Sequence, residues 1–313
     1  MQEDALRQSD EAYHVPVLLQ EAIGLLDVKP DGVYVDCTFG GGGHSRAILG
    51  NLGKEGCLVA FDQDEDAKQN LPDDDRLIFV PQNFRHLQRF LRLHGMQQVD
   101  GILADLGVSS HQFDEAERGF STRYDADMDM RMDRRQPTTA FDILQTFSEG
   151  QLHKLFEQYG EVTNAKTLAQ TIVEVRKNVS LKTIAGFKSA VHGVVKGNPH
   201  KYFAKVFQAL RIEVNDEMGA LREMLEQSAK VLKPGGRIAV ITFHSIEDRI
   251  VKTFLKRGGF EEEAYNPFAQ GSAGAVFKLV NKKPVAAGEE ELRRNPRSRS
   301  AKLRVAERTD VVQ

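Results

Sequence analysis

The chain has 313 residues, 41% of them hydrophobic and 28% charged, which is enough for one large domain or two smaller ones with a substantial core. No apolar run reaches about 18 residues, and the polar N-terminus lacks the apolar segment of a secretion signal, so we expect neither a membrane span nor export. The two cysteines, Cys37 and Cys57, exclude a disulfide framework and a cysteine-built metal site, and they suit a reducing cytoplasm.

The net charge of −3 conceals two basic segments. Residues 151–211 carry ten Lys or Arg against three acids, and residues 292–308 carry seven against one. Seven acids gather in residues 62–75. Charged runs are often only solvated faces, but two basic segments on a mildly acidic chain favour a polyanionic partner.

Apolar, β-branched runs alternate with helical patterns along the first third of the chain. The predicted strands are Val33–Phe39, Leu58–Asp62, Leu77–Val80 and Ile102–Leu106, and the predicted helices are His44–Leu52, Asp64–Asn70 and Phe84–His94. This alternation indicates an α/β fold with a parallel sheet and crossover helices.

The alternation stops after the fourth strand and resumes only at the strand Arg237–Phe243, which the turn Lys233–Gly236 introduces. That gap is far longer than one crossover requires. It contains an irregular polar part and then helical periodicity, and Phe203–Leu232 reads as one long helix returning to the sheet. Two further strands are predicted at Val276–Val280 and Leu303–Glu307. The sequence thus predicts an α/β domain in two parts, residues 1–110 and 206–313, interrupted by a helical insertion at residues 111–205.

The first strand leads into the sequence VDCTFGGGGHS, residues 35–45, whose four consecutive glycines leave the backbone bare. A P-loop would close with Gly-Lys-Ser/Thr, but this run ends Gly43-His44-Ser45 without a lysine. A dinucleotide loop of the pattern G-x-G-x-x-G/A needs a small third residue, and the candidates for it, Ser45 and Arg46, match poorly. Neither phosphate-binding loop fits.

Acidic residues at the ends of the first two strands indicate what the glycine loop binds. Asp36, just before the glycines, would repel a pyrophosphate, whereas S-adenosyl-L-methionine presents an ammonium group, a sulfonium group and no phosphate. Asp62 stands where a doubly wound sheet binds ribose hydroxyls, a feature that a nicotinamide dinucleotide shares. The alternative role for Asp36 is purely structural: it forms a turn at the end of the strand and binds no ligand. The pattern favours S-adenosyl-L-methionine.

The fourth strand ends at Asp105, and ligands of open parallel sheets lie across the carboxyl ends of the strands. A ring-bound amine is a poor nucleophile because its lone pair is delocalised, and an acceptor that holds its N–H turns the lone pair toward a methyl donor. Asp105 suits that role, although Leu-Gly-Val follows it where amine methyltransferases often carry Pro-Pro-aromatic. The alternative role for Asp105 is that of an acidic residue that stabilises the turn after the strand. Phe84 and Gln112 are candidates for residues that line the adenine of the cofactor.

Two other clusters lead to weaker predictions. Asp125–Asp129 resembles the start of a calcium loop but lacks the glycine and the glutamate that such a loop needs. Phe243–Arg249, FHSIEDR, brings together His, Ser, Glu and Asp, yet no G-x-S-x-G serine elbow occurs, so a hydrolase is not expected. His244 and Ser245 follow a strand's carboxyl end and are expected to line the cleft.

Together these segments resemble the bacterial 16S ribosomal RNA (cytosine N4) methyltransferase family. The matching segments cover nearly the whole chain in order and are HVPVLLQE from residue 14, DCTFGGGGHS from 36, DLGVSSHQ from 105, ERGFS from 117, DMDMRMD from 127, FQALRIEVNDE from 207, FHSIEDR from 243 and NPRSRS from 295. The resemblance implies a Rossmann-like class I methyltransferase sheet with an inserted all-helical domain. It also implies methylation of the exocyclic N4 amine of a cytidine, position 1402 in the usual rRNA numbering, in 16S rRNA of the small (30S) ribosomal subunit.

The resemblance also assigns residues. The family's S-adenosyl-L-methionine site falls on Gly42, Gly43, His44, Asp62, Phe84, Asp105 and Gln112, with Asp105 also as the catalytic residue and no metal. Relatives often carry arginine where this chain has Gly41, and a small residue where it has Cys37; neither departure disturbs the loop. The basic insertion is expected to recognise the RNA, and the oligomeric state stays open. A nicotinamide-dependent oxidoreductase and a non-catalytic ribosome assembly factor are the alternatives.

Overall fold

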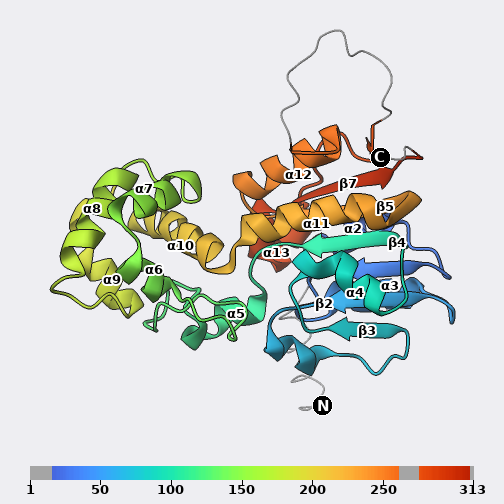
Figure 1. Ribbon diagram of the computed structural model, residues 1–313, viewed down its shortest axis with the longest axis horizontal. Coiled ribbons are helices and arrows are strands. Elements are labelled where there is room, and N and C mark those ends of the chain that lie inside the picture. The colour runs from blue at the N-terminus through green and yellow to red at the C-terminus, as the bar shows by residue number, and fades with distance from the viewer. Residues whose placement is uncertain (1–15, 261–274, 311–313) are drawn as a thin grey trace, which may run out of the picture. The chain divides into compact units, whose positions relative to one another are not determined.

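The computed structural model describes residues 16–260 and 275–310 (Figure 1). The described residues divide into two compact units. The first combines the chain up to Gly107 with the chain from Gly219 onward, and the second is Val108–Met218. The second unit therefore extends beyond residue 205, the end that the sequence pattern predicted for the insertion.

A seven-stranded sheet with the order β3-β2-β1-β4-β5-β7-β6 forms the centre of the first unit (Figure 1). Its strands are β1 (Val33–Asp36), β2 (Cys57–Phe61), β3 (Leu77–Val80), β4 (Val99–Asp105), β5 (Leu232–Thr242), β6 (Phe277–Leu279) and β7 (Lys302–Arg308). The first five strands pair in parallel, and β7 pairs antiparallel with both β5 and β6. The strand order reverses between β1 and β4, the position at which doubly wound sheets bind their ligands.

All seven predicted strands are present, and the α/β class with a mainly parallel sheet is confirmed. The turn predicted at Lys233–Gly236 is wrong, because these residues lie inside β5. Val99 pairs with Leu232 but Gly101 pairs with Arg237, so the extra residues of β5 form an irregularity in the ladder. Gly235 lies there at φ +79°, a conformation that glycine adopts without steric cost.

Helices and 3-10 turns connect the strands of the first unit. They are α2 (Leu19–Leu26), α3 (Gly43–Asn51), η1 (Glu65–Asn70), η2 (Phe84–His86), α4 (Leu87–Leu93), α12 (Ser245–Arg257), α13 (Glu289–Arg294), η5 (Pro296–Ser300) and most of α11 (Glu217–Val231). The helix predicted at residues 64–70 is a 3-10 helix, and the one predicted at residues 84–94 is divided into η2 and α4.

One long helix was predicted over Phe203–Leu232, and that prediction is wrong. α10 (Pro199–Asn215) ends at Asp216, whose backbone lies in the left-handed region at φ 45°, and α11 begins at the next residue. A left-handed residue cannot continue a right-handed helix, and aspartate tolerates this conformation better than most residues do. The apolar periodicity on both sides conceals the break.

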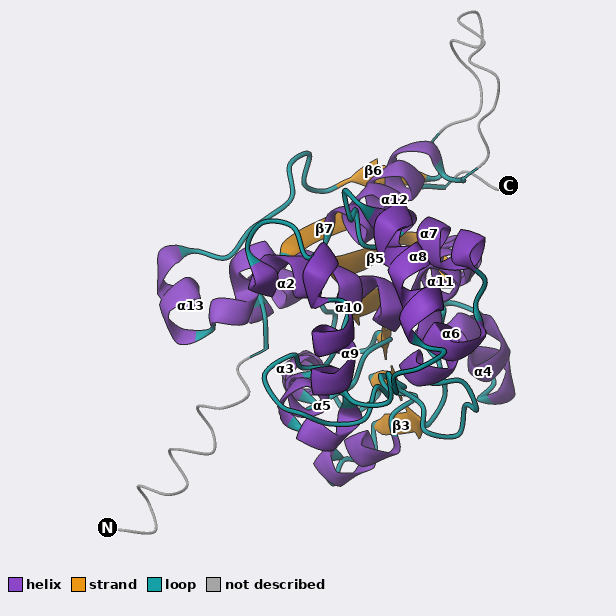
Figure 2. Ribbon diagram, turned by 90° about the vertical axis from the view of Figure 1, so that its left-hand side faces the viewer, coloured by secondary structure: helices purple, strands orange, loops and turns teal. Residues whose placement is uncertain are grey.

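Alternate strand residues pack beneath α2 and α3, and Figure 2 shows α2 lying beside β5 and β7. The buried cluster is made by Val17, Leu18, Ala22, Leu26, Tyr34, Ile48, Leu49, Leu52, Leu58, Leu103, Ala239, Ile241, Ala301, Leu303 and Val305. Because residues 17–26 and 301–305 belong to one cluster, both ends of the described chain contribute to this core.

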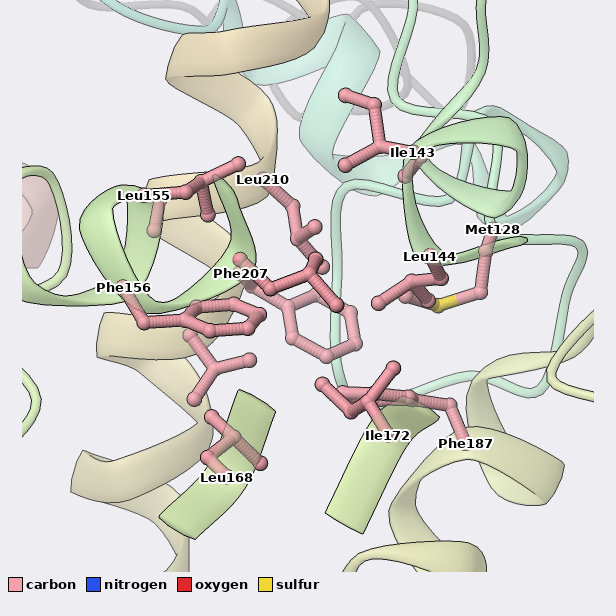
Figure 3. Close-up of a cluster of buried hydrophobic side chains, with 14 of the residues drawn as sticks. Met128, Ile143, Leu144, Leu155, Phe156, Leu168, Ile172, Phe187, Phe207 and Leu210 are labelled. Atoms are coloured by element: carbon pink, nitrogen blue, oxygen red, sulfur yellow. The ribbon is translucent and has the colours of Figure 1, made fainter. Parts of the chain in front are cut away.

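The second unit is helical, with its own apolar core (Figure 3). Its elements are α5 (Ser110–Asp114), η3 (Ala116–Arg118), α6 (Ala140–Thr146), α7 (Glu149–Gln158), α8 (Ala165–Val175), α9 (Ile184–Ala190), η4 (His192–Val194) and α10. In Figure 3, Phe156 of α7, Ile172 of α8 and Phe207 of α10 point into the same cluster. Ridges of apolar side chains at helical spacing therefore hold this unit together.

Buried polar side chains fix the irregular part of the second unit. Arg118, 2% exposed, donates to the carbonyls of Arg131 and Met132. Asn215 of α10 donates to the Met130 carbonyl and accepts from the Met132 amide at 2.7 Å. The acidic segment that resembled a calcium loop is held by backbone contacts of its own, such as the bond from the Met128 N–H to the Lys182 carbonyl at 2.8 Å, and its Asp129 forms an ion pair with Arg131.

Within residues 16–260 and 275–310, no helix combines the length and the apolarity needed to cross a bilayer.

Candidate active site

The glycine loop connects β1 to α3 and leaves almost no room for side chains at two positions. Gly42 lies at φ +76°, and a Cβ there would stand 2.9 Å from Cζ of Phe39. A Cβ at Gly43, the first residue of α3, would stand 2.0 Å from Cγ of Pro16. At Gly41 a Cβ would meet nothing within 4 Å. Bare backbone is therefore a requirement at positions 42 and 43, but not at position 41.

Asp36 lies inside this loop. Its fully buried carboxylate accepts hydrogen bonds from the backbone N–H of Thr38 at 2.9 Å and from Oγ of Ser45 at 2.7 Å. Burial raises the pKa of Asp36, although the neighbouring His44 and these hydrogen bonds oppose that effect. The structure thus favours the turn-forming alternative for Asp36, with the carboxylate joining the end of β1 to the start of α3.

Asp62 joins β2 to the same loop. One carboxylate oxygen accepts from the N–H of Gly40 at 2.7 Å, and the other accepts from the N–H of Asp64 at 2.8 Å. Burial raises the pKa of Asp62 to about 6, against the opposing effect of these two hydrogen bonds. A carboxylate has about four acceptor sites, so Asp62 retains capacity for two further donors such as a pair of ribose hydroxyls.

Asp105 ends β4, between β1 and β5, and the fold does not use its carboxyl group. Its backbone N–H donates to Oγ1 of Thr38 at 2.7 Å, which fixes the main chain. Its Oδ1 is buried and has no hydrogen-bond partner among the described residues, while the side chain as a whole is 23% exposed. Burial, with the charges of Asp36, Glu247 and Glu291, raises the pKa of Asp105 well above its usual range.

His44 is the second residue of α3, and its ring points inward, 5% exposed. Nε2 lies 3.0 Å from the carbonyl oxygen of Val17, and Nδ1 lies 3.8 Å from Oδ2 of Asp105. Burial lowers the pKa of His44, although the charge of Asp36 opposes this. A partly buried acid and a buried imidazole thus face each other at the carboxyl edge of the sheet.

Comparison with known proteins shows the family to which this arrangement belongs. The model of the MraW methylase family matches residues 11–309. The chain belongs to the MraW methylase family. It is 52% identical over 304 residues to a Bacteroides thetaiotaomicron protein named ribosomal RNA small subunit methyltransferase H, covering 97% of this chain and all of the relative. A protein of the same name from Flavobacterium johnsoniae is 51% identical over 297 residues, covering 95% of this chain and 98% of the relative.

Similarity to solved structures is much weaker. An rRNA methylase from Streptococcus thermophilus aligns over 95% of this chain and 98% of its own with a TM-score of 0.40 and 12% identity, too low to carry an argument. Membership in the MraW methylase family rests on the sequence match, and it identifies the chain as a methyltransferase. It also excludes the nicotinamide-dependent oxidoreductase, whose cofactor ribose Asp62 could equally have bound.

The positions that the family resemblance assigned fall in both units. Gly42, Gly43, His44, Asp62 and Asp105 are brought together in the first unit by the contacts described above. Phe84 starts η2, shortly after β3, and is partly buried on the same unit. Gln112 lies in the second unit, where its side-chain oxygen accepts from the N–H of Ser109 in the capping box of α5. Its role in cofactor binding stays a prediction.

The FHSIEDR segment has a structural explanation. His244 caps α12 through a capping box with Glu247, whose buried carboxylate accepts from the N–H of Phe243 at 2.8 Å. Asp248 accepts from the buried Arg304 of β7 at 2.7 Å, and the charge-assisted bond joins α12 to the sheet. We assign these residues to the support of the site.

Thr38 and Ser45 hold Asp105 and Asp36 in place, and neither was predicted from the sequence. Both stand within the glycine-loop segment, so an Asx-type turn starting at Asp36 was a usable signal for Thr38. The contact between His44 and the Val17 carbonyl could not be predicted from the sequence, because every residue has a backbone carbonyl.

Proposed function

We propose that this protein methylates the exocyclic N4 amine of a cytidine, position 1402 in the usual rRNA numbering, in 16S rRNA of the small (30S) ribosomal subunit, with S-adenosyl-L-methionine as methyl donor. The names of the relatives support rRNA of the small subunit as substrate. The observation that carries the proposal is the carboxyl group of Asp105, which is held at the strand-order reversal without a partner for Oδ1 among the described residues.

The residues of the glycine loop suit S-adenosyl-L-methionine. Gly42 and Gly43 provide backbone that a ligand can approach closely, and Gly42, which precedes α3, supplies no side-chain cap to it. Asp62 would hold the ribose hydroxyls, and Phe84 would contact the adenine. When bound, the cofactor supplies an electrophilic methyl carbon attached to a sulfonium.

Asp105 would orient the nucleophile. Its carboxylate accepts a hydrogen bond from the N4 amine, which directs the nitrogen lone pair toward the methyl carbon and supplies an acceptor for the proton that nitrogen must lose. Thr38 fixes the backbone of Asp105, so the acceptor is positioned before the substrate arrives. Because the base must leave its stack to reach a partly buried carboxyl group, single-stranded or splayed RNA is the expected substrate form.

A methyl-transfer assay tests the function. Purified protein, tritiated S-adenosyl-L-methionine and small subunits from cells lacking the enzyme are incubated, and the RNA is analysed by nucleoside mass spectrometry. Label in N4-methylated cytidine of 16S rRNA is the expected result. Cofactor binding without transfer to any form of the rRNA would support the assembly-factor alternative.

We expect the cofactor affinity to fall about tenfold per pH unit below about pH 6. The pKa of Asp62 is raised to about 6 in the free protein, and protonation removes the acceptor that two hydroxyls need. Isothermal titration calorimetry with S-adenosyl-L-methionine between pH 5 and 8 measures this dependence. In Asp62→Asn the affinity should be weaker and flat over the same range; equal slopes in both proteins would exclude Asp62 as the titrating group.

The second unit is proposed to bind the RNA backbone. Lys196 and Lys201 are exposed, whereas Lys182 is paired with Asp127 at 3.3 Å and Lys188 donates to the Thr122 carbonyl. Lys188 also lines a hollow of about 260 Å³ together with Thr122, Ser189, His192, Pro199, His200 and Phe203. These four lysines, of the ten Lys and Arg in residues 151–211, lie around α9 and at the start of α10.

Replacing Lys182, Lys188, Lys196 and Lys201 by glutamine should weaken RNA binding and reduce its salt dependence. The slope of log K against log salt becomes shallower by roughly 0.7–0.9 for each phosphate that a lysine no longer neutralises. Filter binding to 16S rRNA fragments at several salt concentrations measures both effects, with Lys54→Gln/Lys252→Gln, two exposed lysines of the first unit, as control. An unchanged slope in the fourfold variant would assign the insertion another role.

A further inference from the structure

The His44 ring has a contact on each side, and the two contacts differ in kind. On one side Nε2 faces a main-chain carbonyl, that of Val17, at 3.0 Å. On the other side Nδ1 faces Oδ2 of Asp105 at 3.8 Å. The ring is buried, so solvent does not compete for either nitrogen. The family resemblance assigned His44 to the cofactor site, and it gives no role to these two side-chain contacts.

The carbonyl of Val17 decides the tautomer. A carbonyl oxygen only accepts hydrogen bonds, so Nε2 must carry the hydrogen. In the neutral ring Nδ1 is then bare, and its lone pair points toward the carboxyl group of Asp105. Burial lowers the pKa of His44, which favours this neutral form.

The surroundings of Asp105 favour the protonated form of its carboxyl group, so its carboxylate accepts a proton readily and needs a neighbouring base to lose that proton again. The charges of Asp36, Glu247 and Glu291 act on it, and each opposes its ionisation. Oδ1 has no donor among the described residues to stabilise a negative charge. After Asp105 accepts a proton, a bare ring nitrogen at 3.8 Å is positioned to receive it once the distance shortens in the substrate complex.

We propose that His44 is a positioning residue that restores the Asp105 carboxylate by taking its proton on Nδ1, an inference that rests on the function proposed above. Methyl transfer forms the bond between N4 and the methyl carbon and breaks the bond between that carbon and sulfur. The N4–H bond breaks, and the proton passes to the Asp105 carboxylate and then to Nδ1 of His44. The resulting imidazolium is held by the Val17 carbonyl and by the negative charges of Asp36 and Asp105, and it releases the proton to solvent when the product leaves.

His44→Gln separates this role from simple packing. A glutamine amide can donate to the Val17 carbonyl and place an oxygen where Nδ1 lies, so the hydrogen-bonding pattern survives, but an amide does not take up a proton. The matched control is His94→Gln, an exposed histidine at the end of α4.

Single-turnover rates on small subunits, measured from pH 5 to 9, give the kinetic readout. The rate of His44→Gln should fall by about tenfold to a hundredfold, and the cofactor dissociation constant by calorimetry should change less than about threefold. The acid limb of the wild-type profile should depend on two protons and that of His44→Gln on one. An unchanged limb, or a rate loss matched by a loss of cofactor affinity, would overturn the proposal.

A second readout needs no activity. Nitrogen-15 NMR of histidine-labelled wild-type protein, with His44→Gln used to assign the signal, should show His44 as the neutral tautomer with its hydrogen on Nε2. A hydrogen on Nδ1 at neutral pH would overturn the proposal, because that nitrogen could not accept. Absence of rRNA methylation by the wild-type protein would count against the proposed function, and the NMR result would still decide the state of His44.

Discussion

Asp105→Ala is expected to reduce methyl transfer by about 10³- to 10⁴-fold while the protein stays folded. The alanine removes both the acceptor that orients the amine and the group that takes its proton. Asp105→Asn keeps an acceptor oxygen but cannot be protonated at working pH, so about a 10²-fold loss is expected for it. Single-turnover transfer of tritium to small subunits measures both variants, and Asp31→Asn, at an exposed position of the same unit, is the control.

Stability measurements distinguish this loss from unfolding. The pKa of Asp105 is raised in the folded protein, so its contribution to stability is present at low pH and is lost as the pH rises through the folded-state value. Neither variant has a carboxyl group at position 105 to ionise, so neither loses this stability as the pH rises. At pH 8 both variants should therefore unfold at the wild-type temperature or above it. Near-normal turnover in Asp105→Ala would remove this residue from the mechanism, and a lowered unfolding temperature would show that its carboxyl group supports the fold.

Gly43→Ala is expected to weaken cofactor binding by at least tenfold and to destabilise the protein by about 1–3 kcal/mol. The new methyl group would overlap the ring of Pro16, with 2.0 Å between the added Cβ and Cγ, so either α3 or the segment before α2 must move. The same segment carries the carbonyl that holds His44. The change therefore disturbs the loop at two points.

Gly41→Ala is the matched control, because a Cβ at that position meets nothing within 4 Å. Gly41→Arg should be tolerated for the same reason. Calorimetry with S-adenosyl-L-methionine and urea unfolding measure all three proteins. Equal behaviour of Gly41→Ala and Gly43→Ala would show that the loop tolerates side chains generally and that the four glycines have no individual roles.

Local pattern predicted the sheet well, because its strands are short apolar runs flanked by clear turn signals. β3 was placed at its observed bounds, and β2 and β7 differ from the expected ranges by one residue at each end. The errors occurred where local signals conflict. The Lys233–Gly236 segment reads as a turn, yet pairing with β4 draws it into β5, and the residue pair Asn215-Asp216 interrupts an otherwise continuous helical pattern.

The sequence was sufficient to predict the glycines and the strand-end acids of the site. It was not sufficient to predict which residues form hydrogen bonds with them. Asp62 and Asp105 could be found because parallel strands place their carboxyl ends at one edge. The hydrogen bond between the N–H of Leu18 and Glu291 joins residues 273 positions apart, and nothing near either residue indicates the other. The contact of His44 with Val17 and the burial of Arg118 against Arg131 and Met132 are likewise products of tertiary packing.

The bond from Leu18 to Glu291 has a consequence for biosynthesis. Pro16 lies against the start of α3, and the adjoining Val17 and Leu18 are held in turn by Glu291 of α13 and by the β7 residues Leu303 and Val305, which are translated long after β1 to β4. A growing chain can therefore form β1 to β4 early, but it cannot close the glycine loop until its final strand has left the ribosome. Competence to bind the methyl donor should accordingly arise only after β7 has been synthesised, and chains that stop before β7 should lack it.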